Sequence, residues 1–376
     1  MTRALLLLPM LVLSAPLAAQ STDSAAFIIR LGTDTTAVER YVRTDRELVA
    51  EAVSRSPSTM LHRLTIHFDD AGRVVHAIYA LQRPGTDTEA RRVDITFTGD
   101  SARMETVMGS NSRTQTVSAG NAIPMAGPFY APYELAMMRA VASGAMPARI
   151  SLLAGTDTVG IPVERIGTDS ISLTNQFGEP MRAHIDARGR LLHLNTPAFT
   201  TVERLAWVDL DAMVREFAAR DHSGSGLGTL SPRSAYRTVV DDANVWVDYS
   251  RPGMRGRPVW GALVPWGQVW RMGANDAAHI SVDRAVTLGS IDLEPGTYTL
   301  FLLPAQDEWT LIVNRQTNIS GLEHNAAQDV GRIAMRVETM PQAAEQFTIR
   351  VEDTDDAGVL WLQWDRTRAS VPLRVR

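Results

Sequence analysis

Hydrophobic and polar residues alternate along the first part of the chain, from residue 24 to residue 205. The segments MLHRLTIHF (60–68) and RRVDITFTG (91–99) both place every second apolar side chain on one face. Period-two alternation that is interrupted by Gly and Asp turns is typical of antiparallel strands. The pattern therefore predicts an antiparallel meander or half-barrel, with one or two helices, over residues 24–220.

Two stretches of this part have helical instead of alternating patterns. FYAPYELAMMRAVASG (129–144) ends at a glycine, and VDLDAMVREFAAR (208–220) spaces its apolar residues at helical intervals behind an aspartate that can cap the start. We expect helices near 129–144 and 209–220. The second helix closes the first domain.

A Gly- and Ser-rich stretch, DHSGSGLGTLSP (221–232), has the composition of a flexible linker. Seven of the eight tryptophans follow it. Beyond the linker, GTYTLFLLP (296–304) and EWTLIVN (308–314) predict one strand pair, and EQFTIRVED with VLWLQWDR predicts another. Short strands with turn signals predict a jelly-roll-like β-sandwich over residues 233–376. The whole chain is thus predicted to be mainly β.

Two similar hairpins each carry a pair of histidines. HFDDAGRVVH (67–76) and HIDARGRLLH (184–193) share His, Asp, Gly, Arg and His at the same spacing. A three-residue loop with glycine in the left-handed position would pair Ile66 with His76, so His67 and His76 would point to opposite faces. On this register the two histidines cannot share a metal. We expect neither a metal site nor a cofactor.

The first nineteen residues have the layout of a secretory signal peptide, with a charged start, a short apolar run and small residues up to Ala19. No cysteine follows, which speaks against a lipid anchor, and no later segment has the ~20 apolar residues of a membrane helix. We expect an exported chain, periplasmic or extracellular, that is neither lipid-anchored nor membrane-spanning.

Composition excludes several chemistries. The chain has no cysteine, so thiol nucleophiles and disulfides are absent. All 37 of its Lys and Arg residues are arginines, which excludes Schiff-base and other lysine chemistry. A net charge of −5 gives no basic surface of the kind that nucleic-acid binding needs.

The second domain also resembles a bacterial family known as domain of unknown function 2911. The resemblance rests on YSRP (249–252), GR (256–257), LVPWG (263–267), WRMGAN (270–275), PGTY (295–298) and EWTLIVN (308–314). Asp276, Ala278 and Ser290 stand where the family usually has Glu, Thr and Gly, which weakens a catalytic role for Asp276. The resemblance implies an exported setting and no particular activity.

A cluster of arginines, tryptophans and polar residues in this domain is the candidate binding site. It consists of Arg251, Arg255, Arg257, Trp266, Trp270, Arg271, Asn275 and Asp276. Arginines beside aromatic faces suit an anionic or sugar ligand. The same residues can equally form a structural corner, with an arginine paired to Asp276 and the tryptophans in the core. We favour the structural interpretation.

The expected function is a non-enzymatic binding or scaffolding module whose partner is a glycan, an anionic small molecule or an exported protein. Nucleic acid is not expected as a partner. One alternative is a hydrolase that uses Asp276 as acid or base and Arg271 to stabilise negative charge. Another is a carrier of a lipid or other apolar ligand in the concave face of the first domain. Inward-facing apolar residues left uncovered by the 129–144 helix would support the carrier.

Overall fold

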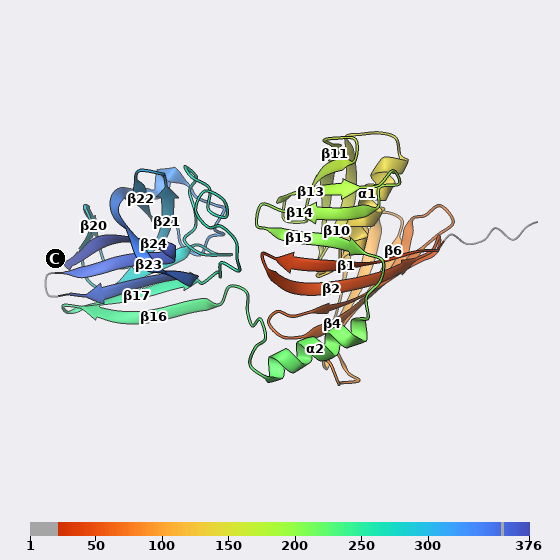
Figure 1. Ribbon diagram of the computed structural model, residues 1–376, viewed down its shortest axis with the longest axis horizontal. Coiled ribbons are helices and arrows are strands. Elements are labelled where there is room, and N and C mark those ends of the chain that lie inside the picture. Colours follow the sequence, from red (N-terminus) through yellow and green to blue (C-terminus); the bar gives the residue numbers. More distant parts are fainter. Residues whose placement is uncertain (1–21, 355–356) are drawn as a thin grey trace, which may run out of the picture.

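The protein is mainly β, and the described residues form two sheets, of fifteen and nine strands, and two α-helices (Figure 1). The computed structural model describes residues 22–354 and 357–376. The predicted signal peptide therefore lies outside the described residues. Within these residues nearly all strand pairs are antiparallel, as the alternation predicts, and the exception is the parallel pair β9–β10.

The N-terminal sheet has the strand order β8-β7-β6-β5-β4-β3-β2-β1-β15-β14-β13-β12-β11-β10-β9. Two runs of sequential neighbours are joined where β1 pairs with β15. This contact joins residues far apart in the chain, such as Phe27 opposite Arg204. Its strands are β1 Asp23–Leu31, β2 Asp34–Arg43, β3 Glu47–Ser54, β4 Met60–Phe68, β5 Val74–Gln82, β6 Glu89–Thr98, β7 Ser101–Met108, β8 Asn111–Ser118, β9 Ile123–Met125, β10 Ala148–Ala154, β11 Asp157–Arg165, β12 Ser170–Thr174, β13 Pro180–Ile185, β14 Leu191–Asn195 and β15 Thr200–Leu205.

The C-terminal sheet has the order β16-β17-β18-β21-β22-β23-β24-β19-β20. The two hairpins predicted for this region are confirmed, because Pro304 pairs with Trp309 and Asp353 pairs with Gly358. Its strands are β16 Arg233–Val240, β17 Ala243–Ser250, β18 Ala278–Val282, β19 Val286–Leu288, β20 Ile291–Leu293, β21 Gly296–Pro304, β22 Trp309–Asn314, β23 Asp329–Asp353 and β24 Gly358–Val375, with a short 3₁₀ helix at Ala326–Gln328.

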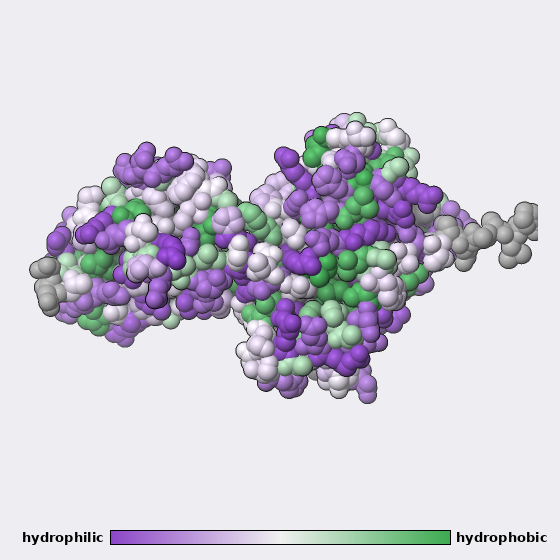
Figure 2. Space-filling view, viewed as in Figure 1, coloured by the Kyte–Doolittle hydropathy of each residue, from purple (hydrophilic) through white to green (hydrophobic). Residues whose placement is uncertain are grey.

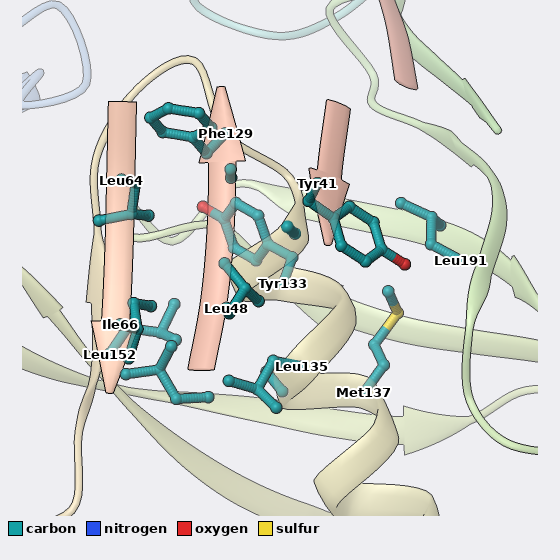
Figure 3. Packing of buried hydrophobic residues seen from close by; sticks show 14 of the residues in the cluster. Tyr41, Leu48, Leu64, Ile66, Phe129, Tyr133, Leu135, Met137, Leu152 and Leu191 are labelled. Carbon is teal, nitrogen blue, oxygen red and sulfur yellow. The ribbon is translucent and has the colours of Figure 1, made fainter. Parts of the chain in front are cut away.

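The two helices, α1 (Ala131–Ala142) and α2 (Leu210–His222), overlap the predicted helical ranges and pack on opposite faces of the N-terminal sheet. On β3, Val53 contacts the α2 cluster, whereas its neighbour Ala52 belongs to the main core with α1. This division follows from the strand period of two. Figure 3 shows α1 beside the strands that carry Leu48 and Leu64.

The predicted register of the histidine hairpins is wrong. His67 lies directly opposite His76, because Val75 is an extra residue that shifts the register beyond the turn. The two rings consequently share a face and stack with centroids 5.6 Å apart. The β13–β14 hairpin has the same shift, and His184 lies opposite His193. A β-bulge of this kind reverses the face of every later residue.

Candidate functional site

The candidate site is a partly open cavity of about 740 Å³ on the α1 face of the N-terminal sheet. Its volume lies within the usual range of small-molecule pockets. The strands contribute apolar side chains, and the segment before α1 forms another wall. The apolar residues that line it include Ile29, Ala37, Leu64, Ala77, Val93, Ile95, Met104, Pro124, Met125, Phe129, Leu153 and Met181.

A row of four polar residues crosses neighbouring strands along one side of this cavity. Ser54, Tyr79 and Arg91 line the cavity, and His62 joins the first two. The Ser54 Oγ lies 2.9 Å from His62 Nε2, and the Tyr79 hydroxyl lies 3.0 Å from His62 Nδ1. The registers of β3 to β6 place these residues on one face, near the same end of their strands.

The environment of this row keeps its imidazole neutral. Burial lowers the pKa of His62 to about 4, so the ring is uncharged at neutral pH. Burial also raises the pKa of Tyr79, although the positive charge of Arg91 opposes that shift. The hydroxyls of the row are therefore protonated, and Arg91 supplies its only permanent charge.

A buried carboxyl group holds the segment that walls the cavity. Glu39, on β2, is fully buried and accepts hydrogen bonds from the backbone N–H groups of Tyr130 (2.6 Å) and Ala131 (3.0 Å) at the start of α1. These donors have no partner within the helix itself. Burial raises the pKa of Glu39 to about 8, despite the two N–H donors that act to lower it.

A second buried network fixes α1 to the sheet. Glu134 of α1 accepts hydrogen bonds from Arg204 (2.5 Å), from the backbone N–H of Leu191 (2.7 Å) and from the Tyr41 hydroxyl. Its side chain is only 1% exposed, and that of Arg204 is 15% exposed. Burial raises the pKa of Glu134, and the charge of Arg204 opposes this shift. The network ties α1 to β2, β14 and β15.

Three of the four arginines of the predicted cluster have separate partners. Arg251 donates to Thr348, and Arg255 pairs with Asp34 of the N-terminal part. Arg257 is buried and donates to the carbonyl groups of Met254, Ala198 and Gly253. These contacts bring Arg255 and Arg257 to the N-terminal part and leave Arg251 beside β23.

Arg271 differs from these arginines because its side chain makes no hydrogen bond or ion pair with any of the described residues. Burial lowers its pKa, and the nearby carboxylates of Glu179 and Asp276 oppose this shift. Asp276 itself is 66% exposed, and its ion pair is with Arg233, at 3.5 Å. Asn275 is also exposed, and its carbonyl accepts a hydrogen bond from Gly321.

The tryptophans of the cluster pack mainly against other aromatic residues. Trp270 stacks on Trp364 with ring centroids 5.7 Å apart, and its edge meets Phe347. Trp266 meets Trp309 edge to face at 6.4 Å and is 37% exposed. Most of this aromatic surface is therefore part of the C-terminal core, while Trp266 keeps part of its ring accessible.

The segment around Arg255 contacts the β1–β2 turn closely. Thr33 donates its backbone N–H to the carbonyl oxygen of Arg255 at 2.9 Å. A Cβ atom on Gly32 would lie 2.1 Å from that oxygen, so the contact requires a glycine. This turn is thus one point at which the two parts of the chain meet.

We expect Gly32→Ala to disrupt this contact and to make the linker at 221–232, which contains Leu227 and Leu230, more sensitive to thermolysin. Gly85→Ala is the matched control, since Gly85 also has a positive φ of 74° but has open space around its Cβ position. Both variants carry the backbone penalty of roughly 1 kcal/mol, and only Gly32→Ala adds the clash. Equal cleavage rates for the two variants would contradict the contact.

No group of three or more candidate metal ligands was found among residues 22–354 and 357–376. Within the same residues, no helix is long and apolar enough to cross a membrane. The paired histidines of the β4–β5 hairpin instead meet carboxylates on neighbouring strands, with His76 Nε2 lying 2.9 Å from Asp94.

The polar row of the cavity was not predicted from the sequence, although the alternation contains a signal for it. His62 stands two positions before Leu64, and Arg91 stands two positions before Val93. Because residues two apart on a strand share a face, each of these polar residues points inward, next to the apolar residues of that face. A histidine and an arginine at such positions mark the place where an apolar face becomes polar.

The fold and cavity define a mainly β protein in two parts. The C-terminal part, residues 231–373, belongs to the DUF2911 family of proteins of unknown function, which confirms the predicted resemblance. The match leaves the residues before 231 without a family. No curated protein matches the chain.

Among solved structures, the chain is similar to the crystal structure of a β-barrel-like protein of the domain of unknown function DUF1849 from Brucella abortus. The two are 10% identical, and the match covers 48% of this chain and 94% of that chain with a TM-score of 0.33. A likeness at this level assigns neither fold nor function.

Proposed function

We propose that the N-terminal part is a non-enzymatic binding module for an apolar small molecule. The observation that carries this proposal is the cavity of about 740 Å³ with its predominantly apolar lining. Transfer of an apolar ligand from water into such a lining is favourable by ~25 cal/mol for each Å² buried. This function is the carrier alternative that the sequence predicts. The apolar strand residues that α1 leaves uncovered, and that line the cavity, support it.

In this proposal the N-terminal sheet acts as an open half-barrel around the ligand. The side chain of Thr158 on β11 donates to the carbonyl of Ser118 on the edge strand β8, at 2.6 Å. This contact supports a sheet that curves until one edge approaches the strands near the other edge. The C-terminal part is proposed to be a jelly-roll-like β-sandwich. The irregular register of the long strand β23 between Thr339 and Thr348 supports a strand that bends between two layers.

Anion binding at Arg271 is the second candidate, and it keeps part of the predicted arginine and tryptophan site. Its support is a partly buried guanidinium group that makes no hydrogen bond or ion pair in the described part of the chain. Partial exposure of Trp266 adds an aromatic surface for a glycan. A hydrolase based on Asp276 has less support, because Asp276 is largely exposed and its ion pair is with Arg233.

We also propose that the protein works outside the cytoplasm, in the periplasm or extracellular space. The support is the signal-like sequence of residues 1–19. Figure 2 supports a water-facing chain, since hydrophilic residues cover much of the face in view. An apolar ligand that crosses an aqueous compartment needs the shielding that such a cavity would provide.

A neutral fluorophore tests the proposed cavity. We expect N-phenyl-1-naphthylamine to bind the wild-type chain, and Ala77→Phe to weaken that binding by about tenfold because the phenyl ring occupies the cavity. Ala80→Phe is the control, since Ala80 stands on the opposite face of β5. Fluorescence titration measures both affinities. Equal affinities for the wild type and Ala77→Phe would contradict the proposal.

A further inference from the structure

The polar row has a property that restricts the kind of ligand the cavity can take. A neutral imidazole has one N–H donor and one acceptor nitrogen. Since His62 contacts hydroxyls through both nitrogens, it donates to one hydroxyl and accepts from the other. The hydroxyl that accepts from His62 keeps its own proton free for a ligand. Whichever tautomer is present, the row offers an O–H donor to the cavity.

Arg91 adds a cation to this donor. Val93 lies opposite Tyr79 on the neighbouring strand, so the two side chains share the cavity face. Arg91 stands two positions before Val93 and therefore points to the same face. Arg91 is exposed and lines the cavity, which places its guanidinium group at the entrance. Its guanidinium group makes no hydrogen bond or ion pair with any other residue of the described ranges. Its five N–H groups are available to a ligand.

The one carboxylate on the cavity lining has other partners. Glu179 accepts a hydrogen bond of 2.8 Å from the Asn175 side chain and lies near Arg271 of the C-terminal part. No ion pair joins Glu179 to Arg91 among the described residues. The side with the polar row presents donors and a positive charge, and the rest of the lining is largely apolar.

We propose, on the basis of the function proposed above, that the ligand is an amphiphile with a carboxylate head group, of the long-chain carboxylic acid class. Its chain lies along the apolar lining. Its head group pairs with Arg91 and accepts a hydrogen bond from the hydroxyl of Tyr79 or Ser54. A carboxylate has only acceptor atoms, so it matches the side of the cavity that offers an O–H donor and the N–H donors of a cation.

The direct test compares cis-parinaric acid with its methyl ester, which has the same fluorescent chain but no charge. We expect the wild-type protein to bind the acid roughly tenfold more tightly than the ester, and this preference to weaken as salt is added. Arg91→Met should remove the preference, and Arg91→Lys should restore part of it. Tyr79→Phe should weaken acid binding by a few-fold.

Arg92→Met is the matched control. Arg92 neighbours Arg91 in sequence, faces the other side of β6 and pairs with Glu89 at 3.3 Å. This variant should keep the preference for the acid. Thermal unfolding of each variant checks that the fold is intact, and Arg91→Met should unfold like the wild type because Arg91 has no partner to lose.

The outcomes separate this inference from the function on which it rests. Equal binding of acid and ester by the wild type, with both weakened by Ala77→Phe, would overturn the carboxylate head group and leave the apolar cavity standing. A preference for the acid that survives Arg91→Met would also overturn the assignment of Arg91. Binding of neither compound would overturn the proposed function itself.

Discussion

Replacing Arg204 with methionine is expected to lower the free energy of unfolding by about 3–5 kcal/mol at pH 7. Methionine keeps much of the apolar stem but removes the cation beside Glu134, whose side chain is 1% exposed. Removal of one partner from a buried ion pair leaves an uncompensated charge, and the cost is of this order. Urea denaturation followed by tryptophan fluorescence measures the change.

The pH dependence of this variant provides an internal check. Without Arg204 the pKa of Glu134 rises further, and the protonated acid is tolerated in the core. The loss of stability should therefore be smaller at pH 5 than at pH 8.

Arg30→Met is the control for the Arg204 substitution. Arg30 pairs with Glu203 on the neighbouring strand, with side chains 31% and 47% exposed. Exposed pairs contribute about 0–1 kcal/mol. If both substitutions lowered stability equally, the buried network would not be what fixes α1 against the sheet.

When the pH is raised from 6.5 to 8, the free energy of unfolding of the wild-type protein is expected to fall by roughly 2 kcal/mol more than that of Glu39→Gln. The pKa of Glu39 is raised from 4.5 to about 8 by burial, so the folded chain holds a proton that the unfolded chain has released. Its stabilising contribution is complete below pH 4.5 and is lost as the pH rises to about 8. The glutamine keeps the shape and one acceptor but does not titrate.

His62 has the opposite effect in a lower range. Its pKa is lowered from 6.5 to about 4, so its contribution is complete above pH 6.5 and is lost as the pH falls toward 4. Near pH 5–6 the effects of the two residues on the free energy of unfolding therefore oppose each other. Above pH 6.5 only the contribution of Glu39 still changes with pH. Unfolding curves of the wild type, Glu39→Gln and His62→Gln over this range separate the two. A pH profile unchanged by Glu39→Gln would contradict the burial of a protonated acid there.

The alternation of the sequence predicts the strands, their antiparallel pairing and the mainly β class, because side-chain period is a local property. It does not predict the bulge at Val75. The same hairpin sequence can pair with or without this bulge, and the bulge decides which face of the sheet each later side chain of β5 occupies. It also does not predict the pairing of β1 with β15, which joins residues far apart in the chain.

The candidate site was only partly predictable for the same reason. The apolar wall follows from positions such as Leu64 and Val93, and the carrier alternative rested on it. The hydrogen bonds of His62 depend on three strands in register, and the pairing of Arg255 with Asp34 depends on how the two parts of the chain meet. The arginines and tryptophans of the second part predict a binding site there, although much of that cluster serves packing and contacts between the two parts.

Anomalous diffraction from crystals of the full chain soaked with 1-bromododecane tests the central claim most directly. The bromine atom reports where an apolar chain binds, without any assumption about its head group. We predict a bromine peak inside the cavity among Leu64, Val93 and Leu153. A peak only beside Trp266, or no peak in the cavity at saturating ligand, would contradict the proposed function.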